Sequence, residues 1–236
     1  MKRSLLIALV AVSAHTLFAA DSDSKSKVAN ANKKLSEKSN YSWTSTAKEA
    51  DGSTGRLGPM EGKTEKSGLT FLSFTVSEIP IEVYIKGEKG TAKALEGWQS
   101  FDDIAQTSAT AAGIVKFLRA HKAPVAESAA LAEKVKELKE TEGVLSGDLS
   151  EEAAKELLTR GARRREGQDP PKIADAKGSV KFWIKDGALA KYEFNVQGKV
   201  TACDRETDVN RTTTVEIKDA DTTKIELPAE AKEKMT

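Results

Sequence analysis

The clearest structural signal of the chain lies in residues 178–194, which read Gly-Ser-Val-Lys-Phe-Trp-Ile-Lys-Asp-Gly-Ala-Leu-Ala-Lys-Tyr-Glu-Phe. Apolar and polar residues alternate on both sides of Asp186-Gly187, a dipeptide typical of two-residue hairpin turns. Phe182 lies on the apolar face of the first half, and Phe194 lies on the apolar face of the second. The stretch therefore predicts a β-hairpin with one apolar and one polar face.

The same alternation occurs before and after this hairpin. Residues 41–46 and 211–218 alternate, and Leu72 and Phe74 share one face of a further strand. We expect the apolar residues of 225–227 to end the sheet. Alternation of this kind is typical of antiparallel sheets with one solvated face.

Helical periodicity separates the two groups of strands. Between residues 102 and 167 we expect a helix capped by Asp102 or Asp103, a helix over residues 126–140, and a helix after a capping box that begins at Asp148. The apolar residues that we expect to point inward are Ile114, Phe117, Leu118, Leu131, Val135, Leu138, Ala153, Leu157 and Leu158.

A sheet with one apolar face needs a second layer to cover it, and the helical segment is the obvious candidate. We therefore predict an α+β fold, in which one curved antiparallel sheet, an unclosed half-barrel, is covered by the inserted helices. Residues 41–236 would form a single domain with its helical insertion at residues 102–167. A polar segment over residues 21–40 would precede it as an amphipathic helix.

The first 20 residues have the layout of a secretory signal peptide. Lys2 and Arg3 are followed by the apolar run 5–18 and the small pair Ala19-Ala20, and the chain turns polar at Asp21. The run is too short for a typical transmembrane helix, which needs about 20 apolar residues. We expect cleavage before Asp21 and a periplasmic or secreted protein. The alternative is an uncleaved N-terminal anchor.

Composition excludes several classes of function. The chain carries 37 basic and 36 acidic residues, so we expect no overall attraction to nucleic acid. Cys203 is the single cysteine, which excludes an internal disulfide. No cysteine lies at the expected cleavage point, where a lipid-anchored bacterial lipoprotein carries one. Abundant lysine and alanine without disulfides favour a bacterial periplasm.

Three stretches resemble the LolA/LppX superfamily of extracytoplasmic lipid and lipoprotein carriers. Tyr-Ser-Trp-Thr-Ser at residues 41–45 resembles the first strand after an N-terminal helix, residues 178–194 resemble the central hairpin, and residues 213–218 with 223–228 resemble the closing strands. Groups of uncharacterised exported bacterial proteins are similar as well. The resemblance implies an unclosed barrel with a helical lid and a lipid or lipoprotein as ligand.

Aromatic side chains are the candidate ligand contacts between sheet and helices. The residues are Trp43, Phe74, Trp98, Phe182 and Phe194, with Trp98 near the expected hinge of the helical segment. Core packing is the alternative role for each of them. The basic cluster of Arg160, Arg163, Arg164 and Arg165 fits a helix C-terminus on dipole grounds, and contact with anionic lipid headgroups at a membrane surface is the alternative.

No motif predicts catalysis, a metal or a cofactor. His121 is the one histidine after residue 20, and we expect it at the surface near a helix end. Zinc needs three or four suitable ligands, and a nucleophile of the Ser-His type needs a partner near the histidine. We therefore expect a non-enzymatic carrier of an apolar ligand. The alternatives are a protein-interaction module of the cell envelope and, less favoured, a hydrolase with paired carboxylates.

Overall fold

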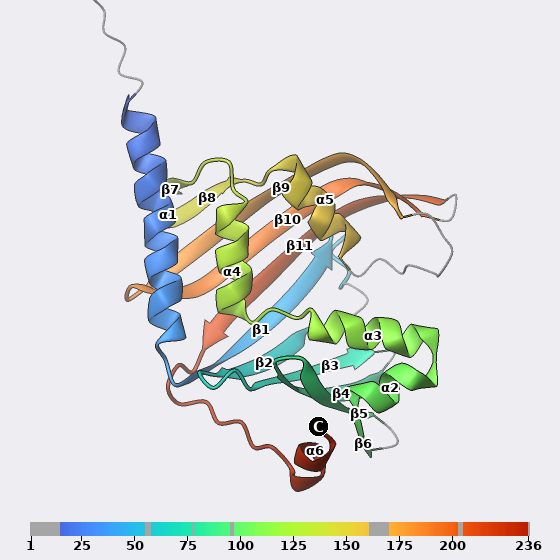
Figure 1. Ribbon diagram of the computed structural model, residues 1–236. Coiled ribbons are helices and arrows are strands. Elements are labelled where there is room, and N and C mark those ends of the chain that lie inside the picture. Colours follow the sequence, from blue (N-terminus) through green and yellow to red (C-terminus); the bar gives the residue numbers. More distant parts are fainter. Residues whose placement is uncertain are drawn as a thin grey trace, which may run out of the picture.

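The computed structural model describes residues 15–54, 58–76, 78–94, 97–160, 170–202 and 205–235. These residues form one eleven-stranded sheet in the order β6-β5-β4-β3-β2-β1-β11-β10-β9-β8-β7, with every neighbouring pair antiparallel (Figure 1). In these ranges β6 and β7 are the two edges, so the sheet curves without closing. The predicted α+β class and the unclosed antiparallel sheet are confirmed.

The sheet consists of two meanders that join through one strand pair. The first contains β1 (Asn40–Glu49), β2 (Met60–Glu65), β3 (Thr70–Val76), β4 (Ile79–Lys86), β5 (Lys89–Ala94) and β6 (Gly97–Ser100). The second contains β7 (Lys139–Thr141), β8 (Val144–Asp148), β9 (Lys172–Lys185), β10 (Ala188–Ala202) and β11 (Arg205–Lys218). Strand β11 pairs with β1, where Ile217 lies opposite Trp43.

The hairpin predicted from residues 178–194 is confirmed as β9 and β10. Asp186 and Gly187 both adopt positive φ, 52° and 75°, which is the geometry of a type I′ turn. Tyr192 lies opposite Phe182, and Phe194 lies opposite Val180. The turn residues thus set the register that brings four large apolar side chains to one face.

Trp43 packs directly on a glycine of the neighbouring strand. Gly62 lies opposite Trp43 in the β1–β2 register, and a Cβ atom at Gly62 would lie 2.1 Å from the indole ring. No side chain fits in that space, so the large ring of β1 covers the bare backbone of β2. This pair fixes the position of Trp43 on the concave face.

Helices cover both faces of the sheet unequally. The concave face carries α1 (His15–Ser36), α2 (Phe101–Thr107), α3 (Ala109–Arg119), α4 (Pro124–Glu133) and α5 (Glu151–Thr159) (Figure 1). The opposite, convex face carries the short α6 (Ala229–Lys234), whose Ala231 packs with Tyr84 and Trp98. The main core therefore lies between the concave face and the first five helices.

Helix α1 lies along the β7–β10 side of the sheet, as Figure 1 shows. Its Val28, Ala31 and Leu35 are buried, as the spacing predicts for residues 21–40. Lys34 donates a hydrogen bond of 2.5 Å to the carbonyl oxygen of Asp186, and Lys27 pairs with Glu140 of β7 at 2.7 Å. In the part of the chain that is described, no helix has the length and apolarity to cross a membrane.

The predicted helix over residues 126–140 is wrong in its second half. Helix α4 ends at Glu133, and β7 and β8 follow as a hairpin within the segment expected to be helical. Glu142 and Gly143, with φ of 52° and 78°, form its turn, and Leu145 of β8 pairs with Phe182 of β9. Strand pairing with β9 overrides the local helical pattern here, and Val135 and Leu138 are buried as predicted.

Three of the four described helices of the insertion, α2, α3 and α5, begin after serines, so the aspartate caps predicted at Asp102 or Asp103 and at Asp148 are wrong. Ser100, Ser108 and Ser150 accept hydrogen bonds from first-turn backbone amides of α2, α3 and α5. Because α3 starts after Ser108, its buried face contains Val115 and Leu118, and Ile114 is 53% exposed. The inward positions predicted for Ala153, Leu157 and Leu158 are confirmed.

The predicted closing strand at residues 223–228 is also wrong. This segment runs over the convex face without strand pairing, and Ile225 and Leu227 pack against Tyr84 and Trp98 there. The hydroxyl of Tyr84 donates a 2.6 Å hydrogen bond to the carbonyl oxygen of Glu226. The partly buried apolar residues of the segment therefore contact the far face of the sheet instead of extending it.

Candidate ligand-binding site

Four of the five predicted aromatic contacts lie together in the core between the concave face and the helices. Trp43, Phe74, Phe182 and Phe194 belong to one cluster of buried apolar side chains. Trp98 does not: it lies on the convex face, where its ring is 5.3 Å from that of Tyr84. Its strand β6 pairs with β5 so that Trp98 lies opposite the outward-pointing Lys93, which the sequence pattern did not indicate.

Helix side chains fill the space above the concave face. Phe182 and Leu72 of the sheet are fully buried, at 0% exposure. The side chains that cover them come from the helices: Val28, Ala31, Leu35, Val115, Leu118, Leu131, Ala132, Ala153, Ala154, Leu157 and Leu158. A ligand can therefore contact this face only after helices have moved away from it.

Polar contacts interrupt the apolar packing of α4 against the sheet and against α1. The hydroxyl of Tyr192, on the concave face of β10, donates a 2.7 Å hydrogen bond to Oε2 of Glu127 on α4. Burial, together with the Glu127 carboxylate, raises the pKa of Tyr192 well above its usual value, so the phenol stays a donor. Ser128, also on α4, donates a 2.7 Å hydrogen bond to Oδ1 of Asn32 on α1.

His121 lies in the link between α3 and α4 and stacks on Trp43. The two ring centroids are 5.6 Å apart with planes inclined by 13°. The predicted place near a helix end is confirmed, but the side chain is half-buried rather than at the surface: its Nε2 is enclosed and has no hydrogen-bond partner among the described residues. Burial lowers the pKa of His121; Glu127 acts against this shift, and Arg160 adds to it.

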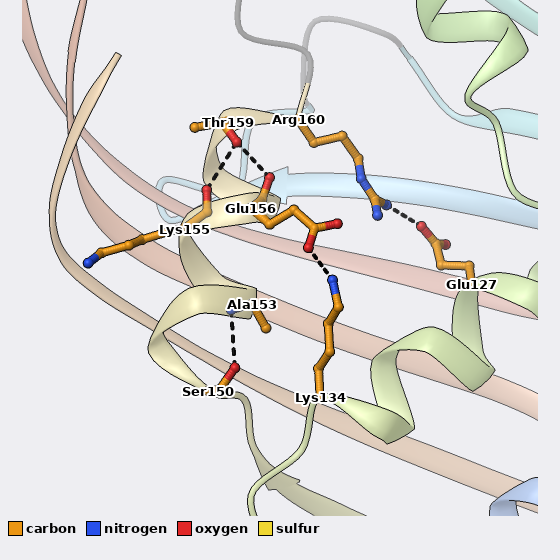
Figure 2. Close-up of polar contacts among 8 residues, drawn as sticks. All are labelled: Glu127, Lys134, Ser150, Ala153, Lys155, Glu156, Thr159 and Arg160. Atoms are coloured by element: carbon orange, nitrogen blue, oxygen red, sulfur yellow. Dashed lines mark hydrogen bonds and ion pairs between the residues drawn. The ribbon is translucent and has the colours of Figure 1, made fainter. Parts of the chain in front are cut away.

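Helices α4 and α5 are joined along their outer sides by two ion pairs, which Figure 2 shows. Arg160 at the end of α5 pairs with Glu127, and Lys134 at the end of α4 pairs with Glu156. Lys134 lowers the pKa of Glu156 through this hydrogen bond. We call α4 and α5 together the helical cover, because their two ion pairs and shared burial join them into one layer.

The space at the seam between these two helices is small. A hollow of about 10 Å³ is lined by residues of both helices, including Leu131, Lys134, Leu157 and Arg160. That volume is at the lower limit for one water molecule. In this arrangement the seam is closed.

The predicted basic cluster is placed only in part. Arg160 binds Glu127 of α4, and this contact was not expected from the sequence. Arg163, Arg164 and Arg165 lie outside the described residues, as does Cys203. Among the residues that are described, no group of three or more His, Cys, Asp or Glu side chains could hold a metal ion.

The sequence missed the polar residues of the helix–sheet interface. The sequence assigned no role to Glu127 or Ser128. One signal could have found Ser128: it lies three residues before Leu131, on the face of α4 that also contains Pro124 and Ala132, and all four are buried. A small polar residue on the apolar face of a helix indicates a polar partner in the layer beneath it.

No model of a known protein family matches this chain, and no curated protein matches it in sequence. Solved structures do match. The lipoprotein LppX of Mycobacterium tuberculosis is similar with a TM-score of 0.46 and 8% identity over 87% of this chain and 98% of LppX. LprF of Mycobacterium bovis is similar with a TM-score of 0.47 and 9% identity over 89% of this chain and 98% of LprF.

A DUF1329 family protein from Desulfovibrio piger is similar at a lower level, with a TM-score of 0.32 and 6% identity over 85% of this chain and 92% of that protein. Identities this low compare the arrangement of sheet and helices and no individual residues.

Proposed function

We propose that this protein binds an apolar chain, such as the acyl chain of a lipid or lipoprotein, against the concave face of its sheet. The observation that carries the proposal is the composition of the interface between sheet and helical cover. The concave face beneath the cover is apolar, whereas two hydrogen bonds fasten the cover to it, from Tyr192 to Glu127 of α4 and from Arg211 to the carbonyl oxygen of Leu157 of α5. The cover would move away, and the chain would take its place.

An acyl chain can replace the apolar contacts that the cover gives up. Phe74 of β3 and Phe182 and Phe194 of the second meander belong to one cluster of buried apolar side chains. Each methylene group that leaves water for such a cluster contributes about 0.8 kcal/mol. The concave face thus stays covered by apolar groups both when the cover is closed and when an acyl chain is bound. The free-energy difference between these two states is smaller than the cost of exposing the face to water.

The polar fastenings lower the cost of opening. The Tyr192–Glu127 contact breaks when α4 leaves the sheet, and the Ser128–Asn32 contact breaks when α4 leaves α1, but water then replaces these partners. The ion pairs Glu127–Arg160 and Lys134–Glu156 lie within the cover, between α4 and α5, so they stay intact when the cover moves away from the sheet as one layer. A purely apolar interface of the same area would resist separation more strongly.

Export belongs to the same proposal. The signal-like residues 1–20 would direct the chain across a membrane and be removed before Asp21. A free carrier in that compartment would hold an apolar chain out of water. This role needs binding and release, with no covalent step.

The test is ligand uptake by the protein purified from a periplasmic fraction, followed by native mass spectrometry and lipid extraction. We expect bound apolar mass that is released on denaturation, and uptake of a fluorescent fatty acid. Tyr192→Phe should increase uptake because it loosens the cover. Tyr84→Phe is the matched control, because it also removes a tyrosine hydrogen bond, but on the convex face. Absence of both bound mass and uptake would contradict the proposal.

One observation favours a second candidate, a protein-interaction module of the cell envelope. Helix side chains already fill the concave face, and a scaffold without ligand needs no more than that. This candidate predicts protein free of lipid, no uptake of fatty acid by wild type or Tyr192→Phe, and a protein partner recovered in stoichiometric amount from envelope extract.

A further inference from the structure

A cleft of about 540 Å³ lies on the convex face, away from the helical cover. Strands β2, β3 and β4 supply one side through Lys63, Phe71 and Tyr84, and the segment 222–226 supplies the other. In Figure 1 this segment belongs to the strap between β11 and α6, which passes below the first meander. A volume of this size accommodates a small organic molecule.

The side of the cleft that belongs to the sheet is aromatic. Phe71 and Tyr84 lie opposite each other on β3 and β4, with ring centroids 5.0 Å apart. Tyr84 continues to Trp98 at 5.3 Å. Of these rings, Phe71 and Tyr84 line the cleft, and a flat ring can pack against them.

Two lysines line the same cleft from opposite sides. The Lys63 ammonium lies 5.9 Å from the centroid of the Phe71 ring and donates a hydrogen bond of 3.3 Å to the carbonyl oxygen of Lys224. Among the ion pairs of the described residues, neither lysine has a carboxylate partner. Each ammonium carries three donors, so several remain for a bound molecule.

Two acids of the segment before the cleft, Asp219 and Asp221, have partners outside it. Asp221 pairs with Lys38 at 2.7 Å, and Asp219 accepts a 2.7 Å hydrogen bond from Ser42. Of the residues that line the cleft, Glu226 is the acid, and Thr222 adds a hydroxyl. The lining therefore has a net positive charge beside an aromatic surface.

The wall formed by the strap is fixed at both ends. The Asp221 amide donates a 2.8 Å hydrogen bond to the carbonyl oxygen of Asn40. At the other end, the carbonyl oxygen of Glu226 accepts a 2.6 Å hydrogen bond from the Tyr84 hydroxyl. Beyond the cleft, Ala231 of α6 is fully buried. A preformed wall reduces the entropy that binding costs.

We infer that this cleft binds a small organic anion that carries a flat apolar ring and a carboxylate, sulfonate or phosphate group. The ring packs on Phe71 and Tyr84, and the anionic group lies between the ammonium groups of Lys63 and Lys224. Charge-assisted hydrogen bonds of this kind are about twice as strong as neutral ones. This site is on the face opposite to the proposed acyl-chain site and does not depend on it.

Three fluorescent or competing probes separate the contributions. 1-Anilinonaphthalene-8-sulfonate carries ring and anion, N-phenyl-1-naphthylamine carries the rings without the anion, and inorganic phosphate is an anion without a ring. Each titration is performed with palmitate present in excess, so that the concave face is already occupied or shown to be inert. We expect binding of the sulfonate, no saturable binding of the amine, and no competition by phosphate at millimolar concentration.

Variants then locate the site. Lys63→Gln with Lys224→Gln should weaken sulfonate binding about tenfold or more, as expected for lost charge-assisted hydrogen bonds. The control pair Lys116→Gln with Lys177→Gln removes two exposed lysines on other elements and should change nothing. Phe71→Leu keeps the apolar volume without the ring and should also weaken binding.

Equal sulfonate affinity in the test pair and the control pair would overturn the inference. Strong competition by phosphate would overturn its aromatic part. Failure of the acyl-chain proposal gives a different pattern, in which palmitate does not bind and the sulfonate still responds to Lys63 and Lys224.

Discussion

The hydroxyl of Tyr192 donates a 2.7 Å hydrogen bond to Oε2 of Glu127, and this bond joins the concave face of β10 to α4. The other carboxylate oxygen of Glu127 pairs with Arg160 of α5. One carboxylate thus connects the sheet with both helices of the cover. Any change that weakens this contact should alter the balance between closed and open states.

Tyr192→Phe should lower the free energy of unfolding and increase ligand affinity together. The change keeps the buried ring and removes one hydrogen bond, which costs about 1–2 kcal/mol. If binding requires the open cover, raising the open population increases the apparent affinity for a fatty acid. Chemical denaturation and fluorescent fatty-acid titration measure the two effects. A loss of stability with unchanged or weaker uptake would contradict the coupling.

Gly62→Ala should destabilise the fold by about 1–3 kcal/mol, the usual cost of overpacking. The added methyl group would lie 2.1 Å from the Trp43 ring, so the indole would have to leave its place on β2. Gly58→Ala is the control, because a Cβ atom there meets nothing within 4 Å. Denaturation midpoints measure the stability of both variants, and the near-ultraviolet circular dichroism of the tryptophans reports whether the Trp43 ring has moved. Equal stability of the two variants would show that the Trp43–Gly62 packing is not fixed.

Stability should decrease as the pH falls from about 7 to 5, because of His121. Burial holds the pKa of His121 below its usual 6.5, so the unfolded chain takes up a proton at a pH where the folded chain does not. The stabilisation is complete above 6.5 and is lost as the pH falls toward the folded pKa. Glu127, Arg160 and Tyr192 face the same region.

The measurement uses the chain from Asp21 onward, where His121 is the one histidine. His121→Phe keeps a ring against Trp43 and should flatten the dependence between pH 7 and 5, whereas Lys122→Gln next to it should retain it. Carboxylates such as Glu156, whose pKa is lowered from the ordinary value of 4.5, titrate at lower pH. An unchanged slope in His121→Phe would assign the pH dependence to other groups.

Removal of residues 1–20 should leave the fold intact. The buried residues of α1 that are described begin at Ser24 and Val28, so cleavage before Asp21 spares them. We expect the protein exported by a Gram-negative host to have the mass of the chain that starts at Asp21. Full-length mass in the membrane fraction would favour the uncleaved anchor instead. The boundaries at residues 20 and 40 stay predictions until then.

The sequence predicted the elements whose signal is local. Alternation around Asp186-Gly187 located β9, β10 and their turn, and the spacing of Val28, Ala31 and Leu35 located the buried stripe of α1. Both follow from side-chain periodicity and turn chemistry, which a single strand or helix expresses by itself. The covered, curved sheet followed from the order of these elements.

What the sequence missed depends on contacts between distant segments. Residues 139–148 form β7 and β8 because β9 offers an edge with which to pair, although Leu131, Val135 and Leu138 are spaced as in a helix. Trp98 lies on the convex face because of the β5–β6 register. The contact of Tyr192 with Glu127 joins residues 65 positions apart, and no local pattern indicates it.

The most direct test of the account is hydrogen exchange with and without palmitate, read at the amides of α4 (Pro124–Glu133) and α5 (Glu151–Thr159). The account predicts that one bound chain per protein makes these amides exchange faster, while β9, β10 and β11 stay protected. Uptake of palmitate with unchanged protection in both helices, or no uptake at all, would contradict the claim that the cover gives way to an apolar chain.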